Sequence, residues 1–266
     1  MKNKVSWQLE TENAKFYEEH AVPAVYAQWA PRSVRAAGVI PGDRVLDIAT
    51  GTGLVARFAA QQAQPDGAVV GYDLNPGMLC VAASIGPQLE WMLGSAEKLP
   101  FETQTFDAVI CQFGLAYVQD KVAALREMYR VLRPGRTLAI AVWDRLDNIP
   151  GYLALANLVA EICGANAAEV LRALFNLGDK ADLLALFEQA NLPEPDIHTL
   201  HGNAKYPSIE AWIACEALGS AIKNLITEEQ LVELKIKAAE ALLPYTTADG
   251  RVMFGTVVHM LTLTKK

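Results

Sequence analysis

The sequence predicts an α/β protein in which helices cover both faces of a mostly parallel sheet. Short apolar runs alternate with amphipathic stretches through the first half of the chain, and turns rich in glycine or proline separate them. The run at 44–48 is almost continuously apolar, as expected of a strand buried on both faces. Further strands are expected at 68–73, 89–93, 105–113, 137–143, 196–201 and 251–263.

Helices are expected to link these strands. The stretch 54–63, directly after the first strand, places its apolar residues on one helical stripe. Pro23 is expected to divide the aromatic segment 12–29 into two short helices, because proline interrupts the hydrogen bonds of a helix interior. A further helix is expected to begin at Asn75-Pro76, and others at about 122–132, 179–190, 208–218 and 227–242. Residues 150–177 form an apolar helical stretch that is expected to be an inserted lid, with a longer core helix as the alternative.

The composition restricts the class of function. The chain has 266 residues, 52% of them hydrophobic, and a net charge of −7. This acidic balance argues against a general nucleic-acid binder, so we expect no nucleic-acid partner. No signal sequence opens the chain, and no apolar run reaches the ~18 residues of a membrane span. The four cysteines are widely spaced, which is typical of a reducing compartment, and we expect a cytoplasmic protein without integral membrane association.

The turn Thr50-Gly51-Thr52-Gly53 follows the first strand and opens the next helix. Its two glycines let the backbone approach a ligand closely, and the free amides of the new helix face that ligand. Asp73 ends the second strand about 20 residues later, where a carboxylate can accept hydrogen bonds from ribose hydroxyls. The alternative is that Asp73 caps the helix that Asn75-Pro76 begins. The unit as a whole favours a nucleoside ligand.

Asp47 distinguishes between nucleoside ligands. The spacing from Gly51 to Gly53 and Ala56 also fits the dinucleotide fingerprint, so an NAD(P)-dependent oxidoreductase is an alternative. A carboxylate at the end of the strand would repel a pyrophosphate and attract an ammonium or a sulfonium group. Asp47 therefore favours a cationic nucleoside derived from an amino acid.

The motif D-I-A-T-G-T-G at 47–53 resembles the first motif of the class I S-adenosylmethionine-dependent methyltransferases. The resemblance is strongest from Val45 to Asp144. Within the family, the chain is similar to the methyltransferases of ubiquinone, menaquinone and secondary-metabolite biosynthesis. It implies a Rossmann-like seven-stranded sheet in the order 3-2-1-4-5-7-6, with the last strand antiparallel. It also implies S-adenosyl-L-methionine as cofactor and S-adenosyl-L-homocysteine as product.

The resemblance also suggests how the chain is divided. Residues 1–149 would hold N-terminal covering helices and the cofactor-binding half of the sheet. Residues 150–178 and 204–248 would be helical insertions that form a lid over the substrate. Residues 179–203 and 249–266 would complete the core sheet. Because both insertions are apolar, we expect a small hydrophobic or aromatic acceptor.

Cofactor contacts follow from the family's motifs. In the family an A-x-x-Y-E segment covers the cofactor, which here assigns Tyr17 to its methionine end; ordinary helix packing is the alternative for Tyr17. After the third strand the family has G-D-A, and Ser95 replaces the aspartate as a weaker, neutral acceptor for the adenine amine. The expected contacts are Tyr17, Asp47, Ala49, Thr50, Gly51, Gly53, Asp73, Leu74, Met78, Gly94, Ser95, Ala96 and Gln112.

Candidate substrate residues lie at the ends of two strands and in the N-terminal segment. The ends of the fourth and fifth strands suggest Phe113, Leu115 and Trp143 as lining of the acceptor pocket, together with His20 from the N-terminal segment. No general base stands out. The candidates are Tyr17, His20, His198 and His201. The histidines are too scattered for a metal site, so no metal is expected.

Two further residues are expected to be structural. Asp107 opens the fourth strand, at the edge of the sheet opposite the ligand. Arg136 replaces the second glycine of the family's P-G-G turn, a change expected to be harmless.

The predicted activity is in-line transfer of a methyl group to a small acceptor, with O-, N- and C-methylation all open. A protein that binds S-adenosylmethionine but acts as a cyclase or a binding module remains an alternative beside the oxidoreductase. The oligomeric state and the need for a base are not predicted.

Overall fold

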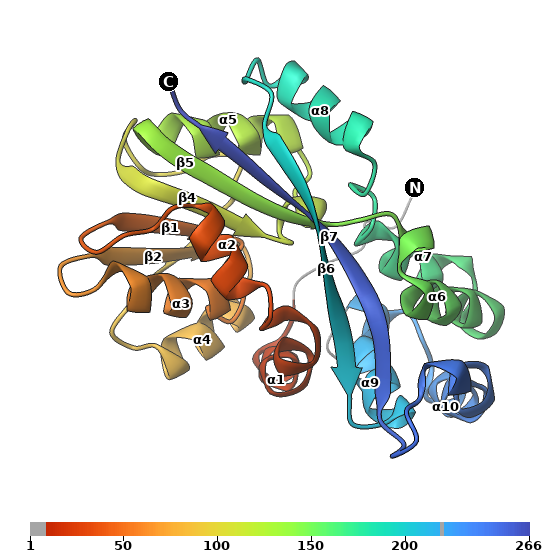
Figure 1. The fold of residues 1–266 in the computed structure, drawn as a ribbon. Coiled ribbons are helices and arrows are strands. Elements are labelled where there is room, and N and C mark those ends of the chain that lie inside the picture. The colour runs from red at the N-terminus through yellow and green to blue at the C-terminus, as the bar shows by residue number, and fades with distance from the viewer. Residues whose placement is uncertain (1–8, 219–220) are drawn as a thin grey trace.

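A seven-stranded sheet forms the centre of the computed structural model, which describes residues 9–218 and 221–266 (Figure 1). The strands lie in the order β3-β2-β1-β4-β5-β7-β6. The first five are parallel, and β7 runs antiparallel to both β5 and β6. The predicted order and the antiparallel last strand are confirmed. The strands are β1 Arg44–Ile48, β2 Ala68–Asp73, β3 Glu90–Leu93, β4 Phe106–Gln112, β5 Leu132–Trp143, β6 Asp196–Tyr206 and β7 Val252–Thr264.

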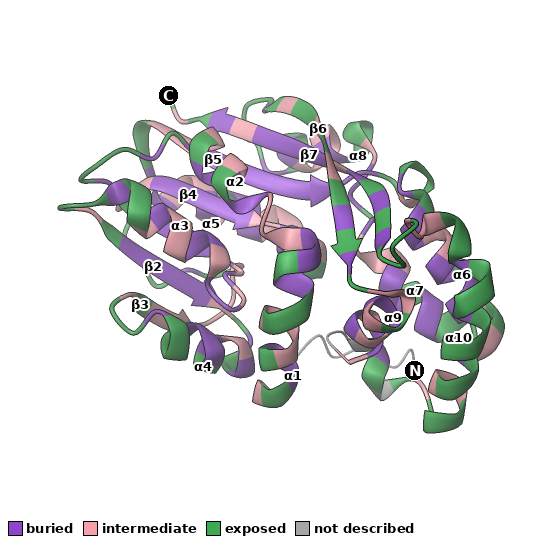
Figure 2. Cartoon of the chain, turned by 60° about the horizontal axis from the view of Figure 1, so that its bottom comes forward, coloured by how far each residue is buried: buried purple, intermediate pink, exposed green. Residues whose placement is uncertain are grey.

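Apolar residues on both faces of the sheet pack against helices, and Figure 2 shows the central strands almost wholly buried. Val45 on one face of β1 packs with α2 and α3, while Leu46 on the other face packs with α5 and α8. The helices are α1 Thr11–Phe16, α2 Ala30–Ala36, α3 Leu54–Ala63, α4 Pro76–Ile85, α5 Lys121–Val131, α6 Pro150–Cys163, α7 Ala165–Ala173, α8 Lys180–Gln189, α9 Ile209–Leu218 and α10 Glu228–Ala241. Short 3-10 turns lie at η2 Leu115–Tyr117, η3 Leu146–Asn148, η4 Ala221–Asn224 and η5 Leu243–Tyr245.

A second body of helices lies beyond the end of β5. Here β6 and β7 stay paired through residues 201–206 and 252–257, past the last partner of β5. The sixth strand is therefore longer than predicted, because its pairing with β7 continues to Tyr206. Helices α6 and α9 pack on this extension around Trp212 and Phe254, and α7 and α10 pack on α6; we call these four helices the lid. Figure 1 shows the lid beside the sheet.

The N-terminal segment crosses from the sheet to the lid. It continues from α1 into η1 Tyr17–Tyr26, a π-helix that contains Pro23, and we call η1 the covering segment. The expected break at Pro23 was wrong, because the wider turn of a π-helix accommodates the ring and the missing amide. The helical stretch expected at 150–177 consists of two helices, α6 and α7, separated at Gly164. Residues 1–8 of the first predicted unit and residues 219–220 of the second insertion lie outside the described residues.

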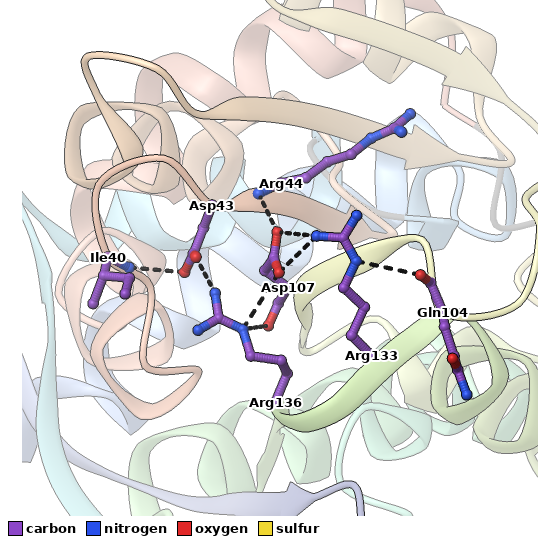
Figure 3. A network of polar contacts seen from close by, with 7 residues as sticks. All are labelled: Ile40, Asp43, Arg44, Gln104, Asp107, Arg133 and Arg136. Atoms are coloured by element: carbon purple, nitrogen blue, oxygen red, sulfur yellow. Dashed lines mark hydrogen bonds and ion pairs between the residues drawn. The ribbon is translucent and has the colours of Figure 1, made fainter.

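An ion-pair network joins three strands at the edge of the sheet where β1 and β4 begin (Figure 3). Asp107 accepts hydrogen bonds from the Arg44 amide and from Arg133, at 2.9 and 2.8 Å. Arg136 donates to the Asp43 carboxylate and, at 3.0 Å, to the Asp107 carbonyl. Asp107 is structural, as predicted. Arg136 is more than a harmless change, because its side chain links β1, β4 and β5.

Candidate active site

A cavity of about 800 Å³ opens where the parallel strands end. One wall consists of the carboxyl ends of β1, β2 and β4 and the loop after β3. The covering segment contributes a second side, and the lid closes the third. Such a position, at the carboxyl ends of the strands of an open α/β sheet, is where these folds bind ligands. Among the described helices, none is long and apolar enough to cross a bilayer.

The Asp47 carboxylate lies buried under the glycine turn. Its Oδ2 accepts hydrogen bonds from the Thr50 hydroxyl at 2.5 Å and from the Ala56 amide at 2.9 Å. Burial raises the pKa of Asp47 to about 7, and the two hydrogen bonds partly oppose this rise. A positively charged ligand in the cavity would stabilise the ionised form. Asp47 is thus positioned to favour a cation at this end of the cavity.

The backbone around Asp47 is unusual. Ala49 and Gly51 both have positive φ angles, of 54° and 57°. Phe113, at the end of β4, also has a positive φ, of 61°. A Cβ on the next residue, Gly114, would lie 2.2 Å from the Ala49 Cβ, so only glycine lets the two strand ends approach this closely. Gly53 is the N-cap of α3 and is not in the cavity lining; it packs against Trp91.

Asp73 faces the cavity from the end of β2. Its Oδ2 accepts from the Gly51 amide at 2.7 Å, and its Oδ1 accepts from the Asn75 amide at 2.8 Å. Burial raises the pKa of Asp73. The N-cap of α4 is Asn75, whose side-chain oxygen accepts from the amides of Gly77 and Met78. The alternative that Asp73 caps α4 was therefore wrong.

Most of the other expected cofactor residues line the same cavity. Gln112 is there, with its side-chain oxygen accepting from the Ser33 hydroxyl at 2.8 Å. Ser95 is there too, and its hydroxyl accepts from the Glu97 amide at 3.3 Å. The remaining members of this wall are Ala49, Thr50, Gly51, Leu74, Met78, Gly94 and Ala96.

The covering segment is attached directly to the glycine turn. Tyr17 lines the cavity, and the next residue, Glu18, bonds both the turn and the helix α3 that follows it. The Glu18 carboxylate accepts from the Thr52 hydroxyl at 2.5 Å and pairs with Arg57 at 2.7 Å. Arg57 in turn donates to the Thr52 carbonyl at 2.6 Å. Glu18 therefore holds the covering segment over the turn.

Some of the expected substrate and base residues lie at the cavity, and others lie elsewhere. Phe113 lines the cavity and stacks on Trp143, with ring centroids 4.2 Å apart, so Trp143 lies behind Phe113. Leu115 is fully buried in the core, outside the cavity lining. His20 is exposed and stacks on Phe16. The exposed His198 and His201 lie on β6, and His201 borders a separate, open hollow between β6 and β7. The structure does not bring these three histidines to the cavity.

The lid side of the cavity carries polar residues that sequence reasoning missed. Tyr152 of α6 and Tyr206 of β6 donate to Glu216 of α9, at 2.9 and 3.2 Å, and their own hydroxyl oxygens lie 3.0 Å apart. All three residues line the cavity. The signal was present, because Glu216 is a charged residue within the apolar stretch I-A-C-E-A-L of α9. Within the described ranges, no group of three or more His, Cys, Asp or Glu side chains could hold a metal ion.

A family model and the curated relatives both indicate a methyltransferase domain. Residues 45–135 match the family model of the methyltransferase domain. The ubiquinone/menaquinone biosynthesis C-methyltransferase UbiE of Xanthomonas oryzae is 45% identical over 117 residues, which are 42% of this chain and 46% of that protein. The chain therefore spans about half the length of the curated relatives it matches.

Solved structures share the fold over most of this chain. The YcgJ protein of Bacillus subtilis matches with a TM-score of 0.60 and 17% identity, covering 90% of this chain and 99% of its own. The Haemonchus contortus phosphoethanolamine N-methyltransferase 2, solved with S-adenosylhomocysteine, matches with a TM-score of 0.59 and 17% identity. That match covers 96% of this chain and 58% of the nematode protein. At such identities the likeness shows the fold alone.

Proposed function

Residues 45–135 form a class I S-adenosylmethionine-dependent methyltransferase domain, and on that premise we propose that this chain methylates a small aromatic acceptor. The single observation that carries the proposal is the cavity, where the acids Asp47 and Asp73 stand at one end and the aromatic lid wall at the other. The similarity to a quinone-biosynthesis C-methyltransferase favours a ring carbon as the methylated atom.

The cavity fits the cofactor by size and charge. Its volume falls within the ~300–1,000 Å³ of small-molecule sites. In the proposed arrangement Asp73 accepts the ribose hydroxyls, and Asp47 offsets the positive charge of the methionine end. Ser95 and Ala96 would contact the adenine edge, and Tyr17 would cover the methionine end.

Methyl transfer requires the protein to orient the two reactants more than to activate them. S-adenosylmethionine supplies a methyl group on a positively charged sulfur, which is already a good electrophile. The chain must hold the acceptor in line with that methyl group and exclude water, and orientation of this kind can remove about 7–11 kcal/mol of a barrier. Glu18 contributes by fixing the covering segment, and Phe113, backed by Trp143, offers a flat apolar surface for an aromatic acceptor.

The lining of the lid side argues for an apolar acceptor. Val25 of the covering segment and Val170, Leu171 and Leu174 from α7 and the turn after it contribute aliphatic surface to the cavity. Beside them stand the rings of Tyr26 and Tyr152. A ring-shaped acceptor would bury apolar area here at about 25 cal/mol per Å².

The test compares wild type with Asp73→Asn and, as a matched control, Asp66→Asn in an exposed turn. Calorimetry should show that wild type and Asp66→Asn bind S-adenosylmethionine equally, whereas Asp73→Asn binds about 10- to 100-fold more weakly because hydrogen bonds to a charged acceptor are lost. Wild type with 1,4-naphthoquinol as probe should release S-adenosylhomocysteine and give a product heavier by one methylene.

Three results would contradict the proposal, and they differ from one another. Binding of NADH instead of S-adenosylmethionine would favour an oxidoreductase. Binding of S-adenosylmethionine with no methylated product from quinols, phenols or amines would favour a cyclase or a binding module. Unchanged affinity in Asp73→Asn would remove the assigned ribose contact.

A further inference from the structure

The Glu216 carboxylate has a fixed orientation at the lid side of the cavity. Two phenol hydroxyls, from Tyr152 and Tyr206, donate to the same oxygen, Oε1. These tyrosines come from α6 and from the end of β6, so three elements of the lid region converge on one carboxylate. Because Oε1 is held twice, the direction of the second oxygen, Oε2, is set as well.

The environment of Glu216 makes it an effective base near neutral pH. Burial raises the pKa of Glu216 to about 7, and the hydrogen bonds from Tyr152 and Tyr206 partly oppose the rise. A general base works best when its pKa lies near the operating pH. The titratable groups that feel the Glu216 charge are Tyr26, Tyr117, Tyr152, Tyr206 and Cys215. Burial raises the pKa of each, and Glu216 raises it further, so these neighbours stay neutral while Glu216 titrates.

Glu216 and the acids of the sheet edge border one chamber. Tyr17 of the covering segment lines the same cavity as Asp73 and as Cys215, the residue next to Glu216. Tyr26, which also feels Glu216, lies edge-on to Phe113 with ring centroids 5.6 Å apart. An acceptor ring on Phe113 would therefore lie in the same cavity as the Glu216 carboxylate.

We propose that Glu216 is the catalytic group that takes the hydroxyl proton of a phenol or quinol acceptor, with Tyr152 and Tyr206 as positioning residues. This inference rests on the proposed methyl transfer. The O–H bond breaks, its proton goes to the Glu216 carboxylate, and its electron pair remains on the acceptor oxygen and spreads into the ring. The acceptor then bonds to the methyl carbon while the sulfur keeps the electron pair of the broken C–S bond. Attack from a ring carbon gives a dienone; water then takes that carbon's hydrogen as a proton, and Glu216 returns its proton to the oxygen, which restores the aromatic phenol and the free carboxylate.

Charge favours a hydroxyl acceptor over an ammonium. S-adenosylmethionine brings positive charge to the chamber, which repels a cationic acceptor and attracts a phenolate. Proton transfer to Glu216 leaves the total charge of Glu216 and the acceptor at −1 both before and after the step. The sulfonium attracts the phenolate that forms, which favours ionisation of the acceptor beside the methyl donor.

The test uses Glu216→Gln, with exposed Glu210→Gln on the same helix as the matched control. Both should bind S-adenosylmethionine as wild type does, which separates this inference from the proposed function. With 1,4-naphthoquinol, Glu216→Gln should lower kcat about 10²- to 10⁴-fold. The loss should shrink along a series of increasingly acidic nitro- and halogen-substituted phenols, because these ionise without a base. The rise of kcat near pH 7 in wild type should be absent from the variant.

A second measurement needs no turnover. In protein loaded with S-adenosylhomocysteine, wild type should prefer 1-naphthol over 1-methoxynaphthalene, and Glu216→Gln should lose about tenfold or more of that preference, as for a hydrogen bond to a charged group. Glu216→Asp keeps a carboxylate and should make kcat less dependent on phenol acidity than it is in Glu216→Gln. Equal preference in wild type and Glu216→Gln, or a loss of kcat that ignores the acidity of the phenol, would overturn the assignment, as would failure of loaded wild type to bind either naphthalene.

Discussion

Asp47 shows how a single residue can serve ligand binding at the expense of stability. Its carboxyl is buried, and burial raises its pKa from 3.8 to about 7. The unfolded chain releases this proton at lower pH than the folded chain does. The free energy of unfolding therefore falls as the pH rises from about 4 to about 7. A cationic ligand reverses the effect, because it favours the ionised carboxylate.

Asp47→Asn should separate these two effects. Asparagine keeps an oxygen for the Ala56 amide but has no charge to bury. The melting temperature of the variant relative to wild type should therefore rise between about pH 4 and about pH 8, while its affinity for S-adenosylmethionine falls. Thermal unfolding at the two pH values and calorimetry measure both quantities. Exposed Asp66→Asn should show neither change, and a melting difference that is independent of pH would contradict the burial argument.

At the scale of elements, the link between the covering segment and the glycine turn depends on Glu18. Its carboxylate and the Arg57 guanidinium are largely buried, with side chains 17% and 20% exposed. The cost of burying this pair is offset by the added hydrogen bond from Thr52. The covering segment should thus open as one unit when the Glu18 contacts are lost.

Glu18→Gln removes the charge while keeping the shape of the side chain. Losing hydrogen bonds to a charged group costs about 1.5–3 kcal/mol, so the dissociation rate of S-adenosylmethionine should rise by about tenfold or more. Stopped-flow displacement measures the rate, and hydrogen exchange of the amides at 17–26 reports the opening. The neighbouring, exposed Glu19→Gln is the control. An unchanged dissociation rate would mean that Glu18 does not hold the segment closed.

At the scale of the whole molecule, the two walls of the cavity differ in how far sequence predicts them. The sheet-edge wall follows from local order: the glycine turn and Asp73 are recognisable by spacing, and the parallel strands bring their ends together. The lid wall depends on contacts between distant segments, since Tyr152 lies 54 residues from Tyr206 and 64 from Glu216. No periodic pattern in the sequence predicts that these three residues come together. The π-helical turn at Pro23 escaped prediction for a related reason, because contacts with distant segments outweigh the local preference for a break.

The edge of the sheet opposite the cavity is where the fold itself can be tested. Arg136 bonds Asp43 ahead of β1 and Asp107 at the start of β4, with its side chain 27% exposed and that of Asp43 7% exposed. Arg136→Gln should lower the free energy of unfolding by about 1–2 kcal/mol at neutral pH, measured by urea unfolding. Exposed Arg145→Gln, whose own ion pairs have side chains about half exposed, should change it by less than about 0.5 kcal/mol.

The contribution of this ion-pair network to the free energy of unfolding depends on pH with the opposite sign to the contribution of Asp47. Although burial opposes it, the Arg44 amide and the Arg133 and Arg136 guanidiniums together hold the pKa of Asp107 below 3.8. The stabilisation from this network is therefore complete above about pH 4 and is lost as the pH falls through the lowered pKa. Arg136→Gln should lose less stability than wild type between about pH 5 and pH 3, because part of the network is already absent. If the free energies of unfolding of wild type and Arg136→Gln fell equally as the pH was lowered, the assigned role of Arg136 would be contradicted.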